Sequence, residues 1–158
     1  MFNFNPDLAA YAANGLRTAL NGGTLFLFAG TVPADADAAL DLDTVHTQVA
    51  ALSAGGGGLN FDAATDAFLY KSASETWVGL VDFDGFQSGS TTLTPTFFRF
   101  CPAGDTGRDA GTGPRLQGTV TGQTGNGDIK LQSATVTDNG TNEVGVAGFY
   151  IELANLSG

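Results

Sequence analysis

The chain has 158 residues, and its 16 acidic and 6 basic side chains give a formal net charge of −10 at pH 7. This balance argues against a nucleic-acid partner, because phosphate contacts need clustered Lys and Arg. No run approaches the ~18 apolar residues of a membrane span. The length predicts one domain, and the 23 glycines and 12 phenylalanines are typical of strands joined by tight turns.

Residues 1–23 predict an N-terminal helix or arm. Pro6 is suited to a first helical turn, apolar side chains follow at helical spacing, and Gly22 and Gly23 end the pattern. An exposed apolar segment of this kind marks an interface, and the alternative is that its side chains cap the β region. The candidate contact residues are Phe2, Phe4, Leu8 and Tyr11.

From residue 24 onward the pattern is mainly that of strands. The continuous apolar run over residues 24–29 predicts a central strand. Pro33 and the alanines after it predict a short helix over residues 33–40. Alternation over residues 45–51 then predicts a half-buried strand with His46 on its solvent side.

The second half of the chain adds further strands. Residues 59–62 and 67–71 are expected to pair as a hairpin, and residues 102–114 to form a surface loop. The sequence "DNGT" after residue 137 predicts a second hairpin turn. The other expected strands cover residues 76–86, 96–101, 116–120, 129–131, 134–137 and 143–153.

This count of about eight to ten strands predicts a mainly β, single-domain β-sandwich. We expect a jelly-roll-like or an immunoglobulin-like arrangement with an N-terminal helix or arm. The domain boundaries that follow are an arm over residues 1–23 and the β-sandwich over residues 24–158.

Residue types that support catalysis are scarce. His46 is the one histidine, and no Gly-x-Ser-x-Gly motif surrounds a serine, so the sequence offers no hydrolase triad. Cys101 is the one cysteine, so it forms neither an internal disulfide nor a zinc cage, and we expect a buried or edge thiol. The sequence therefore predicts neither an enzyme nor a cofactor.

A metal ion is not expected either, and calcium has only weak candidates in Asp105 and Asp109. These carboxylates lie four apart in a glycine-rich loop, which lacks the full twelve-residue pattern and closing Glu of a calcium loop. The alternative is that both are solvated turn residues. Solvation in a crossover segment is also expected for Asp35, Asp37, Asp41 and Asp43.

Several stretches resemble a family of tailed-bacteriophage virion structural proteins. They are "GLRTALNGGTLFLFAGTVPADADAAL" (15–40), "ETWVG" (75–79), "FFRF" (97–100) and "PRLQGTV" (114–120). The resemblance implies a particle component made in the host bacterial cytoplasm, and it brings no catalytic residues to transfer.

Within that family, an acidic, base-poor β domain favours a capsid decoration (cement) protein on the outer surface of the virion head. The expected partners are the major capsid protein and copies of the chain itself, as a homo-trimer or dimer, without nucleic acid or membrane. One alternative is a phage tail or head–tail junction component. Another is a carbohydrate-binding β-sandwich module in which Trp77 stacks on a sugar, although its apolar neighbours favour a core position for Trp77.

Overall fold

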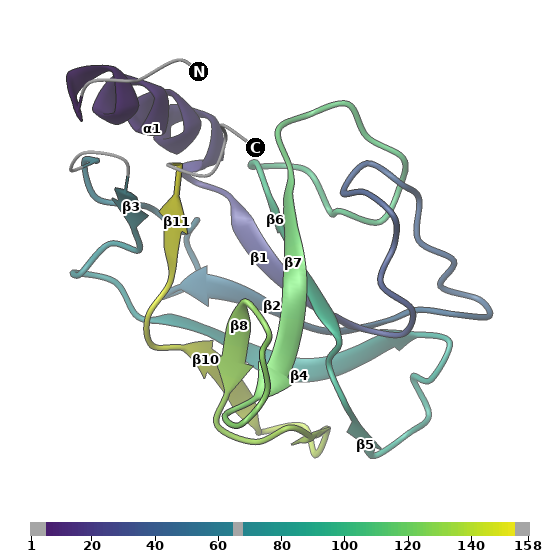
Figure 1. The fold of residues 1–158 in the computed structure, drawn as a ribbon. Coiled ribbons are helices and arrows are strands. Elements are labelled where there is room, and N and C mark those ends of the chain that lie inside the picture. Colours follow the sequence, from purple (N-terminus) through teal and green to yellow (C-terminus); the bar gives the residue numbers. More distant parts are fainter. Residues whose placement is uncertain (1–5, 65–67, 154–158) are drawn as a thin grey trace.

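A computed structural model describes residues 6–64 and 68–153, and over these residues the chain forms one helix and eleven strands (Figure 1). The expected fold class is confirmed, because the chain is a mainly β single domain, sandwich-like or barrel-like, with an N-terminal helix. In chain order the elements are α1 (Pro6–Leu20), β1 (Thr24–Ala29), β2 (Thr47–Ala54), β3 (Phe68–Tyr70), β4 (Trp77–Gly85), β5 (Thr92–Leu93), β6 (Phe97–Cys101), β7 (Leu116–Gly122), β8 (Ile129–Leu131), β9 (Val136–Thr137), β10 (Glu143–Val146) and β11 (Tyr150–Glu152).

Seven strands form one large sheet in the order β10-β4-β2-β1-β6-β7-β8. Neighbouring strands are antiparallel except β7 and β8, which run parallel. The two outermost strands, β8 and β10, approach each other, so the sheet is nearly closed. Two small sheets complete the domain, β3 with β11 and β5 with β9.

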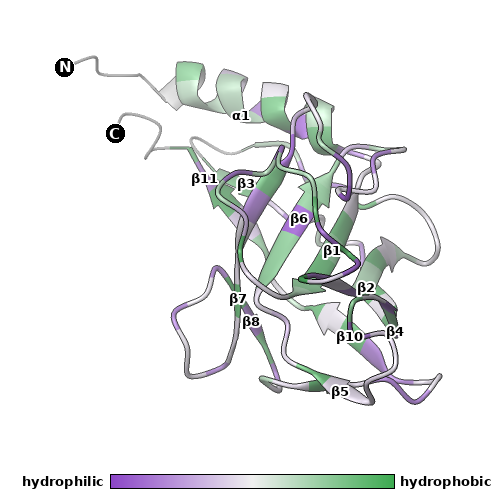
Figure 2. Ribbon diagram, turned by 90° about the vertical axis from the view of Figure 1, so that its right-hand side faces the viewer, coloured by the Kyte–Doolittle hydropathy of each residue, from purple (hydrophilic) through white to green (hydrophobic). Residues whose placement is uncertain are grey.

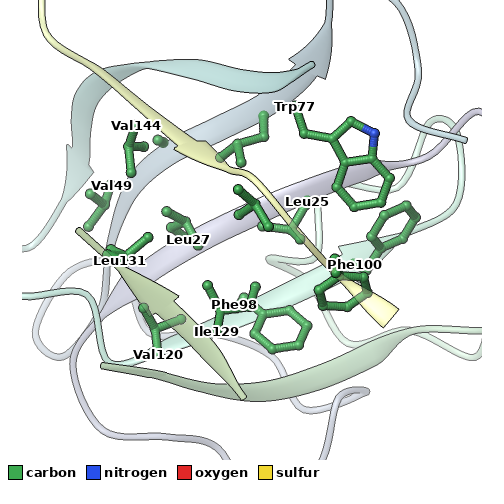
Figure 3. Packing of buried hydrophobic residues seen from close by; sticks show 14 of the residues in the cluster. Leu25, Leu27, Val49, Trp77, Phe98, Phe100, Val120, Ile129, Leu131 and Val144 are labelled. Atoms are coloured by element: carbon green, nitrogen blue, oxygen red, sulfur yellow. The ribbon is translucent and has the colours of Figure 1, made fainter. Parts of the chain in front are cut away.

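The main hydrophobic core lies inside this curved sheet. Leu25 and Leu27 of β1 point into it, together with Phe98 and Phe100 of β6 and Trp77 of β4 (Figure 3). Trp77 is almost completely buried, as its apolar neighbours predict. Burying one such side chain stabilises the fold by roughly 1.5–3 kcal/mol, so this core is a main source of stability.

The opposite face of the same strands carries a second, smaller cluster. Two loops, residues 30–46 and 102–115, lie over it, and Leu40 of the first loop packs against its side chains. Strand β1 is therefore buried on both faces, as its continuous apolar run predicts. The buried members of this cluster are Phe26, Phe28, Phe97 and Cys101.

The short helix expected over residues 33–40 is wrong, because this segment forms turns and bends. A helix needs its backbone carbonyls for internal hydrogen bonds. Here Arg99 donates hydrogen bonds to the carbonyls of Asp35 and Ala38, and Arg115 donates one to the carbonyl of Ala36. The helix is prevented by arginines that are distant in the sequence.

The hairpin expected at "DNGT" is also wrong, although the turn itself forms around Gly140, whose φ is 77°. The strands on its two sides have different partners, since β9 pairs with β5 and β10 pairs with β4. By contrast, residues 59–62 and 67–71 do pair, through a bridge between Phe61 and Lys71.

The single strand expected over residues 143–153 is divided into β10 and β11. Phe149 lies between them and turns into the core, where its ring contacts Phe61, Trp77 and Phe98. The chain then continues as β11 along β3 rather than along β4.

Candidate interaction surface

Helix α1 is fixed to the domain at its C-terminal half. Arg17 donates from Nε to the carbonyl of Phe61 (3.0 Å), and Asn14 accepts the N–H of Ala64 on its Oδ1 (3.0 Å). Leu20 is fully buried in the main core. These contacts fix the helix beside β3, at one end of the sheet (Figure 2).

Two of the four predicted contact residues lie on the exposed side of this helix. Leu8 is 48% exposed and Tyr11 is 80% exposed. The other two, Phe2 and Phe4, lie outside the described residues. The described part of the helix therefore presents apolar side chains to solvent.

An aromatic face lies at the same end of the domain, on the small sheet of β3 and β11. We use this name for Phe68, Tyr70 and Tyr150, whose ring centroids are 5.9 to 6.2 Å apart. Tyr70 is 46% exposed and Tyr150 is 60% exposed. The residues that alternate with them, Leu69 and Ile151, pack on the core side.

Sequence reasoning did not single out this face. Its members are two residues apart within β3, and Tyr150 is directly opposite Tyr70 in the register with β11. Alternating aromatics in "FLY" were a usable signal within one strand. The pairing of β3 with β11 joins residues about eighty positions apart in the sequence, and the local pattern does not contain it.

A polar network joins the segment around Asn60 to the start of β4. The carboxylate of Glu75 accepts hydrogen bonds from Asn60 and from the indole N–H of Trp77 (2.8 Å). Burial alone would raise the pKa of Glu75, but these hydrogen bonds hold it below its ordinary value. Lys71 lies over the Trp77 ring, with its Nζ 5.7 Å from the ring centroid.

A cleft of about 490 Å³ opens beside the small sheet. Its walls are β7 with the turn before β8 on one side and the segment leading into β11 on the other. Its apolar lining includes Leu116, Ile151 and the rings of Phe98 and Phe149, which meet edge to face 5.7 Å apart. Asp128 and Lys130 supply charged groups in the lining.

Three arginines, Arg99, Arg108 and Arg115, hold the two outer loops, residues 30–46 and 102–115. Of these, Arg99 is fully buried. It donates from Nη1 to the carbonyls of Ala38 (2.8 Å) and Gly107 (2.6 Å), and from Nε to Oε1 of Gln117 (2.9 Å). Burial lowers the pKa of Arg99. In Figure 2 the hydrophilic segment in the otherwise hydrophobic β6 agrees with this position. A charged residue within an apolar strand run was a signal for such a buried arginine.

The weak calcium candidates are organised by Arg115. Its Nε lies 2.7 Å from Oδ2 of Asp105, and its Nη2 donates to Oδ1 at the same distance. Its Nη1 donates to the backbone carbonyl of Asp109. Within residues 6–64 and 68–153, no group of three or more His, Cys, Asp or Glu side chains could hold a metal ion. The Asp105 carboxylate is thus a partner of an arginine.

The crossover aspartates mainly shape the first loop. Asp35 accepts the backbone N–H groups of Asp37 and Ala38, and Asp41 accepts those of Asp43 and Thr44. The hydrogen bonds from Thr44, first from its side chain, lower the pKa of Asp41. Such Asx turns are a common structural use of Asp in loops.

The expected solvent position of His46 is wrong, because the residue is buried just before β2 begins. Its Nδ1 accepts the N–H of Asp41 (3.0 Å), which leaves the proton on Nε2, 2.8 Å from the carbonyl of Thr31. Cys101 is buried as expected, and burial raises its thiol pKa to about 12. Both side chains therefore serve the fold in this arrangement.

Comparisons of the chain with protein families, with curated proteins and with solved structures gave no match. None of the described helices is long and apolar enough to cross a membrane.

Proposed function

We propose that the protein is a tailed-bacteriophage virion structural protein that binds the outside of the head shell and stabilises it. The observation that carries the proposal is the exposed aromatic face beside α1, on an acidic domain. Clustered exposed aromatic side chains are typical of protein interfaces, where they contribute most of the binding free energy. The sequence stretches that resemble virion structural proteins support the same function.

The proposed partners are the major capsid protein and further copies of the chain. A base-poor surface with a net charge of −10 suits a protein that works near a packaged genome without binding it. A cement protein needs rigid contact surfaces, because ordering them on binding costs free energy. The hydrogen bonds of Glu75 and of Arg17 in α1 hold the segments beside the aromatic face to the rest of the domain.

Binding to heads that lack the protein tests this function. The double variant Tyr70→Asp/Tyr150→Asp should no longer sediment with such heads, since it places two charges on the aromatic face. The control Leu80→Asp/Phe86→Asp alters two side chains of comparable exposure, 48% and 52%, on another part of the domain. The control should bind like the wild type. If Tyr70→Asp/Tyr150→Asp sedimented with the heads as well as Leu80→Asp/Phe86→Asp does, the proposed role of the aromatic face would be contradicted.

Location on the particle separates head from tail. Cryo-microscopy of virions should show density for the protein on the outer head surface, and heads without it should break at lower temperature. Density confined to the tail or the head–tail junction would contradict the cement function and identify the protein as a tail or junction component.

A carbohydrate-binding module is the second candidate, and the aromatic face is what favours it. Three neighbouring rings offer a platform on which a sugar ring can stack. Trp77 cannot serve this purpose, because its ring is buried. Binding on a glycan array that is lost in the Tyr70→Asp/Tyr150→Asp variant would favour this candidate. Absence of glycan binding together with head binding would favour the cement protein.

A further inference from the structure

Two strand edges line the cleft beside the aromatic face without pairing to each other. β7 pairs with β6 along residues 116–119 but with β8 only from Val120 onward. β11 pairs with β3 on one side. The cleft lies between the first half of β7 and the start of β11. The domain therefore has a seam between the curved sheet and the small sheet of β3 and β11.

The backbone groups at this seam point into it from both sides. Val120 donates its N–H toward β6, to Thr96, so the alternating residues Gln117 and Thr119 turn theirs to the other side. The N–H of Thr119 is taken by the Asp128 carboxylate at 2.8 Å. The N–H of Gln117 has no hydrogen-bond partner within the described residues.

The β11 side of the seam is similar. Phe149 accepts the N–H of Lys71, so residues 149 and 151 turn their backbone groups toward β3. Tyr150 and Glu152 turn theirs away from β3, and their N–H groups likewise have no partner among residues 6–64 and 68–153. Two open edges on either side of one cleft are the arrangement that an added strand fills.

The lining of the seam selects an occupant with alternating apolar side chains. The ring of Phe98 fills the space that a side chain at Gly118 would take, and the Phe149 ring lies edge-on beside it. Leu116 and Ile151 remain partly exposed on the two walls. A strand placed here would direct every second side chain onto these apolar groups and the others to solvent.

One segment of this chain has that pattern and lies outside the described residues. Residues 1–5 read Met-Phe-Asn-Phe-Asn, so Phe2 and Phe4 alternate with Asn3 and Asn5, and the segment contains no acidic side chain. A segment without acidic side chains avoids repulsion by a domain of net charge −10. The segment precedes the end of α1 that projects beyond the sheet (Figure 2).

We propose that residues 1–5 of one copy insert as a strand between β7 and β11 of a second copy. The aromatic residues Phe2 and Phe4 would cover Leu116 and Ile151, and the backbone would pair with Gln117 and Tyr150. Repeated around a symmetry axis, this exchange closes into a ring. The inference deepens the proposed function, since it gives the self-association of the cement protein a mechanism.

Cross-linking of purified protein tests the exchange without any capsid, so its failure is distinguishable from failure of head binding. One chain carries Asn3→Cys and a differently tagged chain carries Glu152→Cys; Glu152 is exposed, and Cys101 is buried. Paired strands bring facing residues within the range of a disulfide. We expect a disulfide between the two tags, and Asn5→Cys serves as a second position in case the register differs.

Two results would overturn the proposal. One is the absence of a cross-link to Glu152→Cys from both Asn3→Cys and Asn5→Cys, which would indicate that the occupant of the seam, if any, is a segment of another protein. The other is a disulfide formed only within single chains of the Asn3→Cys/Glu152→Cys variant, which would show insertion into the same copy.

A matched pair of charge variants gives a second readout. Phe4→Asp places a carboxylate on the apolar side of the inserted strand, and Asn3→Asp places the same charge on its solvent side. Sedimentation equilibrium should show association weakened at least about tenfold by Phe4→Asp and by less than about threefold by Asn3→Asp. Equal effects would contradict the alternating placement of the segment.

Discussion

Replacing Arg99 by methionine tests whether the outer loops depend on one buried guanidinium. Methionine keeps an unbranched apolar side chain but removes the hydrogen bonds to the carbonyls of Asp35, Ala38 and Gly107 and to Gln117. These four acceptors would lose a charged donor at once. Leaving a buried acceptor unpaired costs about 1–3 kcal/mol.

We expect the lower end of that range for each acceptor, because the loops lie at the surface and water can enter. The Arg99→Met variant should therefore lose about 4 kcal/mol of unfolding free energy. For a domain of this size that loss corresponds to a fall in Tm of roughly 8–16 °C. Because the acceptors are carbonyl and amide oxygens, added salt should change the loss little.

Urea unfolding followed by Trp77 fluorescence measures this difference. Arg108→Met is the matched control, since Arg108 belongs to the same loop layer but its ion pair with Asp84 is 28% and 58% exposed. Exposed ion pairs contribute about 0–1 kcal/mol. Arg108 also donates to Oε1 of Gln48, a partly buried contact worth about 1 kcal/mol, so this control should lose much less than Arg99→Met. A loss below 1 kcal/mol in Arg99→Met, or a loss equal to that of the control, would refute the reasoning.

The remaining predictions concern acid, the thiol and two glycines. Hydrogen bonds from Arg115 hold the pKa of Asp105 below the ordinary 3.8, so their contribution to stability is present above that pH and is lost as the pH falls through the lowered pKa. Asp105→Asn should therefore unfold at lower urea than the wild type at pH 7, and the difference should shrink as the pH falls below 3.8. Cys101, with a thiol pKa of about 12, should react with a thiol reagent at pH 8 only as fast as the protein unfolds; fast labelling of folded protein would contradict its burial. Gly15→Ala should raise the unfolding free energy by about 0.5–1 kcal/mol, because Gly15 lies inside α1 and an added Cβ meets no atom within 4 Å. Gly79→Ala should lower the Tm in a thermal scan, because its Cβ would overlap the carbonyl oxygen of Ala51; a higher Tm would contradict that contact.

Local sequence pattern predicts the elements whose burial is decided by their own residues. After Thr24, β1 is apolar at every position and is buried on both faces. Strand β4 alternates and shows alternating burial. In both, the side chains that define the pattern are those that enter the core, so neighbours in the sequence are sufficient to predict the structure.

The failures occur where distant residues decide. Residues 33–40 have a composition that favours a helix, but Arg99 and Arg115 take the carbonyls that the helix would use. His46 was expected on the solvent side of a strand, but the strand begins one residue later and the ring turns to Thr31 and Asp41. Both arginines, and Thr31 in the case of His46, lie outside a window of ten residues around these positions.

Of the candidate interaction surface, the sequence predicted the exposed side of the helix but not the aromatic face or the seam. An amphipathic helix is a local pattern, and Leu8 and Tyr11 are exposed as an interface requires. The aromatic face and the seam depend on β3 pairing with β11, and on β8 pairing with only the second half of β7. Strand pairing over such separations is set by the packing of the whole domain.

The distribution of positive charge links the fold to the way this protein can bind. Of the six basic residues, Arg99, Arg108 and Arg115 hold the outer loops, Arg17 fixes α1, and Lys71 contacts the Trp77 ring. Lys130 is thus the one basic side chain without a hydrogen-bond, ion-pair or ring partner within the described residues. Because the fold uses nearly all of its cations internally, the solvent meets mainly carboxylates. For a partner that is not itself basic, the free energy of binding must then come from apolar contacts, and the aromatic face, the exposed side of α1 and the seam offer them at one end of the domain.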